Sequence, residues 1–128
     1  MNRRIVTLVI LITCYGCSTA QGQGLLSPAA FAQKATQLKD AVVLDVRTPD
    51  EYRSGHMIKA KNIDWSGNDF EKQVALLDKT KPVLLYCQRG GRSESAAKKL
   101  RGLGFKEVYD LDGGLSAWQA ARLPVTRE

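Results

Sequence analysis

Residues 84–93 read LLYCQRGGRS, and this stretch decides the fold class of the chain. Its apolar run stops at Cys87, and a short apolar run bounded by turn residues is typical of a strand buried on both faces, as in a parallel sheet. Gly90 and Gly91 then permit a tight loop, and a helical pattern starts near Ser93. The stretch predicts a strand, a glycine loop and a helix, with a thiol where the strand ends.

The same alternation extends along the rest of the chain. Apolar periodicity and caps predict helices at 27–38, 48–52, 68–79, 93–105 and within 112–124, and strands at 41–46, 82–87 and 107–111, with a brief strand ending near residue 63. Strands that alternate with helices indicate an α/β fold, a parallel sheet with helices on both faces. Sites in such sheets form beyond the carboxyl ends of the strands, which is where Cys87 stands.

The N-terminal segment has the pattern of an export signal. Two arginines precede an apolar run at 5–13 that is too short to span a bilayer. We expect a lipoprotein-type signal at 1–16, with Cys17 as the lipidated residue, a flexible tether at 17–24 and one domain at 25–128. Cys14 is a competing site, and an uncleaved anchor or plain secretion are the alternatives. The domain is expected in the bacterial periplasm or cell envelope, held to the membrane by its signal or lipid alone.

Cysteine usage then isolates one thiol. The chain has three cysteines, and two of them belong to the signal region. Cys87 has no partner for an intramolecular disulfide in the mature domain, so it is either a reactive thiol or a buried structural cysteine.

The surroundings of Cys87 favour the reactive thiol. Backbone N–H groups of a glycine loop and the start of a helix form a cradle for an anion, and cationic neighbours such as Arg89 and Arg92 lower the pKa of a thiol. Four residues separate Cys87 from Arg92, one fewer than in phosphate-transferring cysteine enzymes, so the cradle suits one additional sulfur atom better than a phosphoryl group.

Other chemistries have less support. His56 could serve as a base, but its place in a turn favours a structural role. One histidine and one mature cysteine do not make a first-shell set of N and S ligands, so we expect neither a metal nor a cofactor. The net charge of +6 comes without aromatics interleaved among the basic residues, so no nucleic-acid partner is expected.

The motif CQRGGRS resembles the active-site loop of single-domain rhodanese sulfurtransferases. Residues 44–63 and 96–118 resemble the two other signatures of that family, with Ile58 and Lys59 departing from a common proline and glycine. The resemblance implies the three-layer rhodanese fold with a five-stranded parallel sheet.

The resemblance also implies a mechanism and a set of roles. Cys87 would take the outer sulfur of a donor such as thiosulfate as a persulfide and pass it to cyanide or a cellular thiol. The loop residues Gln88, Arg89, Gly90, Gly91, Arg92 and Ser93 would bind the substrate and persulfide. Asp45, Arg47, Glu51 and His56 would support the structure of a protein expected to be a monomer.

Two other functions remain open at this point. One is a persulfide carrier or binding module of the envelope that does not turn over. The other is a phosphatase or arsenate reductase on the same fold.

Overall fold

Strand β4 (Val83–Tyr86) lies at the centre of a five-stranded parallel sheet with the order β1-β5-β4-β2-β3. In this computed structural model, which describes residues 23–128, every residue of β4 is buried. Val83 and Leu85 enter one hydrophobic core, and Leu84 and Tyr86 enter a second core on the opposite face. The uninterrupted apolar run therefore reflects burial on both faces, as predicted.

The remaining elements surround β4. The other strands are β1 (Gln23–Leu26), β2 (Val42–Asp45), β3 (Lys61–Asn62) and β5 (Val108–Leu111). The helices are α1 (Pro28–Gln37), α2 (Pro49–Ser54), α3 (Phe70–Val74), α4 (Gly91–Gly102) and α5 (Gly114–Ala120). β2 and β5 are the two neighbours of β4, with Asp45 opposite Tyr86 and Asp110 opposite Leu85.

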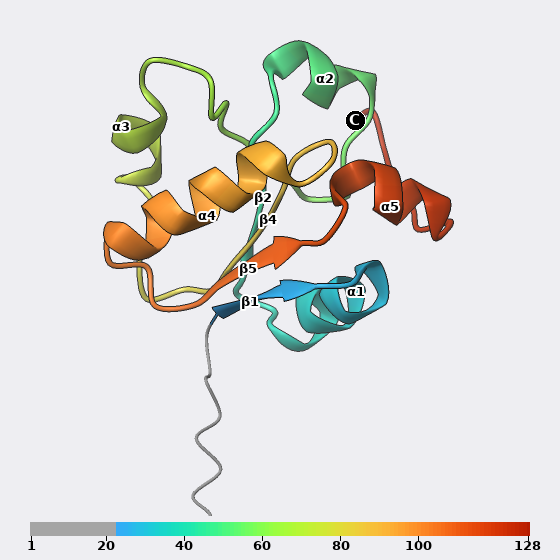
Figure 1. The fold of residues 1–128 in the computed structure, drawn as a ribbon, viewed down its shortest axis with the longest axis horizontal. Coiled ribbons are helices and arrows are strands. Elements are labelled where there is room, and N and C mark those ends of the chain that lie inside the picture. The colour runs from blue at the N-terminus through green and yellow to red at the C-terminus, as the bar shows by residue number, and fades with distance from the viewer. Residues whose placement is uncertain (1–22) are drawn as a thin grey trace, which may run out of the picture.

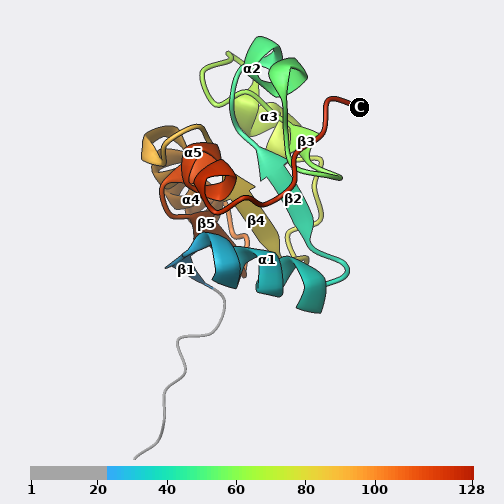
Figure 2. The ribbon, with the colours of Figure 1, turned by 90° about the vertical axis from the view of Figure 1, so that its right-hand side faces the viewer.

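Helices cover both faces of this sheet (Figures 1 and 2). The apolar sides of α3 and α4 pack on one face, around Phe70 and Leu100. α1 and α5 pack on the other face, where the rings of Phe31 and Trp118 meet edge to face with centroids 6.0 Å apart. The α/β class, the five parallel strands and the helices on both faces are confirmed.

The helical faces expected from apolar spacing are also observed. Phe31 is buried, with Ala35 and Leu38 packed against its core. Val74 and Leu100 are fully buried in the core under α3 and α4. Local periodicity thus located the buried side of each helix.

The domain begins earlier than predicted. The predicted tether at 17–24 includes Gln23 and Gly24, but these residues belong to β1 and lie opposite Val108 and Tyr109 of β5. Gln23 and Gly24 give no apolar signal, and the structure places them in an edge strand through backbone pairing with β5. Residues 1–22, which hold the predicted signal, Cys17 and the rest of the tether, lie outside the described residues.

Two helix boundaries also differ from their predicted positions. α3 ends at Val74, and Leu76 and Leu77 continue with N–H bonds to the carbonyls three residues back, which is a tighter turn. α4 begins at Gly91 rather than near Ser93, because Gly90 is its N-cap in a left-handed conformation with φ 113°. The earlier start places the first amides of α4 closer to Cys87.

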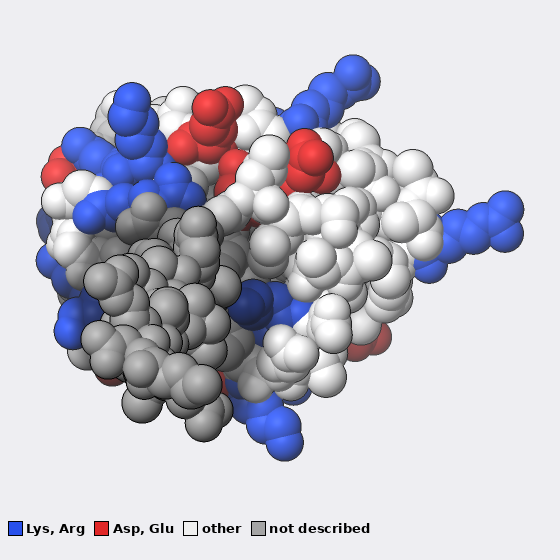
Figure 3. Space-filling model, turned by 60° about the horizontal axis from the view of Figure 1, so that its bottom comes forward, with Lys and Arg blue, Asp and Glu red and all other residues white. Residues whose placement is uncertain are grey.

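The surface and the helices add two observations. On the face shown in Figure 3, basic side chains gather at one edge and otherwise stand singly, with acidic side chains nearby. Within residues 23–128, none of the helices has both the length and the apolar character needed to cross a membrane.

Candidate active site

Cys87 follows β4 at the carboxyl end of the sheet, and the loop to α4 folds around its sulfur. The Gly90 N–H donates a hydrogen bond to the Cys87 Sγ at 3.0 Å. The backbone N–H groups of Arg89 and Ser93 and the hydroxyl of Ser93 also interact with this sulfur. The predicted loop is therefore brought together as a cradle of N–H groups around one atom.

Burial and hydrogen bonding act in opposite directions on the Cys87 thiol. Burial raises the pKa, while the bonds from Ser93, Gly90 and Arg89 lower it, and the net effect is a pKa below the ordinary value. The side chain is only 1% exposed, so these donors, rather than water, stabilise the negative charge. The site therefore favours a thiolate that is shielded from bulk solvent.

The first turn of α5 holds the loop from its other side. The N–H groups of Leu115 and Ser116 donate to the carbonyl oxygens of Cys87 and Gln88, at 2.8 and 3.0 Å. With both carbonyls held in this way, the loop presents its own N–H groups to the sulfur.

This contact requires glycine at position 114. Gly114 has φ 62°, and a Cβ there would lie 2.6 Å from the carbonyl oxygen of Cys87. This contact with the active loop was not predicted from the sequence. The available signal was the pair of successive glycines, Gly113 and Gly114, one residue after the end of β5.

Arg92 connects the loop to α2. Its Nη1 and Nη2 donate to Oε1 and Oε2 of Glu51, at 2.7 and 2.9 Å. Glu51 also forms a capping box with Thr48. The pKa of Glu51 is lowered to about 2, mainly by the hydrogen bond from Arg92. Burial raises this pKa, and the bonds from Thr48 lower it further. Arg92, which the sequence placed in the loop, lies in the first turn of α4, and Glu51 lies in α2.

A buried ion pair supports the adjoining strand. Asp45 and Arg47 are 0% and 2% exposed, and Arg47 Nη2 lies 2.7 Å from Asp45 Oδ2. Arg47 also donates to the Gly55 carbonyl at 2.6 Å and to the Gln88 side chain at 3.1 Å. The pair therefore joins β2, the end of α2 and the active loop.

Gln88 and Arg89 differ in their freedom. The amide of Gln88 accepts from Arg47 and donates to the Ser116 hydroxyl at 2.9 Å, so both of its ends are held. Arg89 is exposed, and no ion pair joins it to another residue in the described part of the chain. Of the two variable loop side chains, Arg89 is the one available to an incoming anion.

His56 takes part in a structural contact. Its Nδ1 and Nε2 each lie 2.8 Å from a backbone oxygen, of Tyr52 and of Glu128, and its ring stacks on Tyr52 at 3.7 Å. Its backbone bridges to Thr126, which fixes the end of the chain beside α2 (Figure 1).

A pocket of about 350 Å³ gives access to the site. It is lined by Glu51, Cys87, Gln88, Arg89, Gly91 and Arg92. The arrangement provides a nucleophilic sulfur, N–H donors for negative charge on it and a cationic rim. This arrangement, at the carboxyl edge of an α/β sheet, can support nucleophilic attack by a cysteine thiolate.

Comparison with known proteins agrees with this description. The rhodanese-like domain matches residues 27–121, and the chain belongs to the rhodanese-like family. It is 40% identical over 91 residues to the thiosulfate sulfurtransferase GlpE of Ectopseudomonas mendocina (strain ymp), covering 69% of this chain and 81% of the relative. It is 38% identical over 89 residues to GlpE of Coxiella burnetii (strain RSA 493 / Nine Mile phase I), covering 70% and 81%.

A solved structure has the same fold. The rhodanese-related protein from Thermoplasma volcanium superposes with a TM-score of 0.71 at 29% identity, covering 80% of this chain and 97% of the other. The resemblance identified from the sequence is confirmed, and the chain is an enzyme of the sulfurtransferase class.

Proposed function

We propose that this protein transfers the outer sulfur of thiosulfate to a thiol or cyanide acceptor through a persulfide on Cys87. The observation that carries the proposal is the set of N–H donors focused on one shielded sulfur atom, with the Gly90 N–H at 3.0 Å from the Sγ. The GlpE relatives, named as thiosulfate sulfurtransferases, support the choice of donor.

The reaction proceeds in two displacements. The Cys87 thiolate attacks the outer sulfur of thiosulfate, the new S–S bond forms, and the S–S bond of thiosulfate breaks. Sulfite leaves with the electron pair of that bond. The acceptor then attacks the outer sulfur of the persulfide and restores the thiolate, as thiocyanate forms from cyanide or a persulfide forms from a thiol.

The loop residues have separate tasks in this scheme. Arg89 attracts the anionic donor into the pocket, because it is exposed at the rim. The N–H groups around Cys87 stabilise the negative charge on the persulfide. Arg92 holds the loop through Glu51 and contributes positive potential.

The test combines turnover with intact mass. Wild-type protein mixed with thiosulfate should gain the mass of one sulfur atom and should form thiocyanate when cyanide is added. The Cys87→Ser variant, which keeps the shape of the site, should do neither. A wild-type protein that neither gains sulfur nor turns over contradicts the proposal.

The same preparation separates the two alternative functions. Stoichiometric loading without steady-state turnover would identify a persulfide carrier. Hydrolysis of an aryl phosphate by the wild type, absent from Cys87→Ser, would identify a phosphatase. The short gap between Cys87 and Arg92 favours sulfur transfer over that second outcome.

We also propose that the protein works outside the cytoplasm, anchored by a lipid on Cys17. The basic start, the short apolar run and the cysteine that follows support this location. Expression in a bacterium with a labelled fatty acid should label the wild type in the membrane fraction and leave Cys17→Ser unlabelled, while Cys14→Ser should keep the label. Label that persists in Cys17→Ser contradicts the assignment.

We further propose a monomer, in which groups of the same chain hold the Cys87 sulfur and the site needs no second subunit. Light scattering during size exclusion should give the mass of a single chain at enzyme concentrations that show full activity. A dimer mass under those conditions contradicts this proposal.

A further inference from the structure

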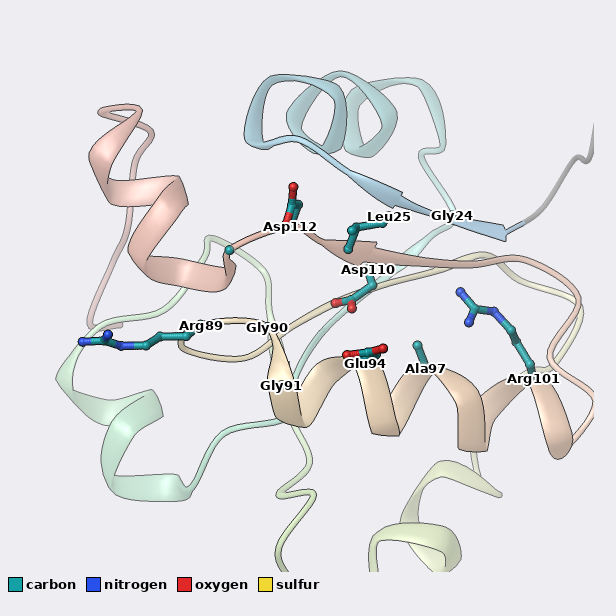
Figure 4. Close-up of a pocket in the computed structure, with 11 residues that line it drawn as sticks. Gly24, Leu25, Arg89, Gly90, Gly91, Glu94, Ala97, Arg101, Asp110 and Asp112 are labelled. Atoms are coloured by element: carbon teal, nitrogen blue, oxygen red, sulfur yellow. The ribbon is translucent and has the colours of Figure 1, made fainter.

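A second pocket lies beside the active loop, where α4 covers only part of its face of the sheet. Asp110 of β5 and Leu25 of the outermost strand β1 are paired in register, so they face the same side. Val108, two residues before Asp110, is buried in the core with α4, whereas Leu25 is 63% exposed. The pocket between α4 and β1, drawn in Figure 4, has a volume of about 660 Å³. Pockets of this size hold small organic molecules.

This pocket is separate from the one that opens on Cys87, but the two border the same loop. Its lining includes Gly90 and Gly91 but not Cys87, while Gly91 and Arg89 line both pockets. The Gly90 N–H is the donor that lies 3.0 Å from the Cys87 Sγ. A molecule in the larger pocket would therefore contact the loop that holds the nucleophile without contacting the sulfur.

A buried carboxyl in this pocket has an oxygen without a partner. Asp110 is only 4% exposed, and Figure 4 shows its carboxyl extending from β5 toward α4, where it faces Glu94. Its Oδ1 is buried and accepts no hydrogen bond from the described residues. No ion pair within residues 23–128 includes Asp110 or Glu94. Leaving a buried acceptor without a donor is costly, so this oxygen indicates a position for a donor group of a bound molecule.

Arg101 supplies the complementary group in the same pocket. Its Nη2 donates to the Val108 carbonyl at 3.3 Å, but its Nε is buried and donates to none of the described residues. Figure 4 shows the guanidinium extending from α4 toward β5. Arg101 forms no ion pair with Asp110 or with another carboxylate in the described part of the chain. The pocket therefore holds an unused acceptor and an unused donor of opposite charge.

We propose that this pocket binds a small zwitterion, a free amino acid, with its ammonium group on Asp110 and its carboxylate on Arg101. An ammonium group has N–H donors for Oδ1, and a carboxylate accepts from Nε. Glu94 adds negative charge on the ammonium side, and Leu25 and Ala97 line the pocket with apolar surface for a hydrocarbon side chain. The proposal goes beyond sulfur transfer, because it assigns a second ligand site to the protein.

The test titrates isotope-labelled wild-type protein with L-leucine and two matched analogues, followed by NMR. Isopentylamine keeps the hydrocarbon and the ammonium group without the carboxylate, and 4-methylpentanoate keeps the carboxylate without the ammonium group. Leucine should bind with a Kd of about 1 mM, and each analogue should bind at least about tenfold more weakly. The amide signals of Gly24, Gly91 and Gly113 should shift, while those of Lys98 and Leu103, at a different pocket, should not.

Two outcomes of this titration overturn the proposal. One is the absence of a shift at the three glycines with leucine at about 50 mM, well above the expected Kd. The other is an equal affinity for leucine and for either analogue, because a zwitterion site needs both charged groups.

The pH dependence of binding tests the Asp110 contact in the unmodified protein. Burial is the main cause that raises the pKa of Asp110 to about 6, with Glu94 acting in the same direction and Arg101 in the opposite one. The other charged groups of the pocket are Asp112 and Arg89, and β1 contributes no titratable side chain. An ammonium group prefers the ionised carboxyl, so the affinity for leucine should rise about tenfold from pH 5 to pH 7. A constant affinity over this range overturns the assigned contact.

Two variants and a control assign the two ends of the ligand. Asp110→Asn should bind leucine about tenfold more weakly at pH 7 and lose the pH dependence, and Arg101→Gln should lose the preference for leucine over isopentylamine. Lys98→Gln removes a charge from an exposed position of α4 at a different pocket, so it should bind as the wild type does. Unchanged binding in both Asp110→Asn and Arg101→Gln overturns the proposal. Binding needs no sulfur donor, so these results are separate from the sulfurtransferase assay.

Discussion

At the scale of single residues, the site depends on one buried pair of charged groups, Asp45 and Arg47. Arg47 neutralises Asp45 and holds the Gly55 carbonyl and Gln88 while itself being 2% exposed. A buried pair of this kind contributes little net stability relative to apolar residues, but the loss of one partner leaves an uncompensated charge.

We predict that Arg47→Met destabilises the protein strongly. The variant leaves the Asp45 carboxylate buried without its partner, which costs about 3–5 kcal/mol in the free energy of unfolding. Urea denaturation of the single variant and of the double variant Asp45→Asn/Arg47→Met measures this cost. The double variant should recover much of the loss, and equal losses in the two proteins would contradict the explanation.

At the scale of elements, two helices hold the active loop from opposite sides. α5 binds the carbonyls of Cys87 and Gln88 through its first amides, and α2 binds Arg92 through Glu51. β4 places the thiol, but these two helices determine the direction of the N–H groups around it. The contact between α5 and the loop leaves no room for a side chain at position 114.

We predict that Gly114→Ala lowers both activity and stability. A Cβ would lie 2.6 Å from the Cys87 carbonyl oxygen, and the left-handed conformation alone costs about 1–2 kcal/mol for alanine. We expect kcat/KM for thiosulfate to fall about tenfold or more as the loop is displaced.

Gly102→Ala is the matched control for this prediction. Gly102 is in α4, and a Cβ there would meet nothing within 4 Å. The variant should therefore keep its activity. Its free energy of unfolding should rise by about a few tenths of a kcal/mol, because alanine has a higher helix propensity than glycine. Melting curves and initial rates of the two alanine variants decide the question. Equal behaviour would show that position 114 does not hold the loop.

At the scale of the whole molecule, two carboxyls make the stability depend on pH with opposite signs. Glu51 has a pKa lowered from 4.5 to about 2, so its ion pair stabilises the fold above its ordinary pKa and is lost as the pH falls toward 2. Asp110 has a pKa raised from 3.8 to about 6, so the folded state binds its proton more tightly. Stability from that proton is lost as the pH rises from about 4 through 6.

We predict that Glu51 and Asp110 together contribute most to the free energy of unfolding between about pH 4 and pH 5. Urea denaturation at a series of pH values should show Glu51→Gln flattening the acid side of the curve and Asp110→Asn flattening the side between pH 4 and 6. Each effect should be of the order of 1–2 kcal/mol or less at its limit. Curves of unchanged shape in both variants would contradict the assignment.

Local patterns gave the fold class and the nucleophile. The apolar run into Cys87 required burial on both faces of a sheet, and the glycines after it required a loop, because these properties depend on neighbours in the chain. The same patterns missed β1, because this edge strand begins with Gln23 and Gly24 and is held by backbone pairing with β5. The structural roles expected for Arg47 and Glu51 came from the family resemblance, and the one expected for His56 came from its place in a turn.

The sequence by itself determined the parallel α/β sheet, the helical faces and the thiol at the end of β4. The tertiary structure decided which distant groups act on that thiol. Glu51 and Arg92 are 41 residues apart, and the close approach of Gly114 to the loop likewise crosses between elements. Periodicity reports the face on which a side chain lies, whereas the partner that it meets there is fixed only when the elements pack.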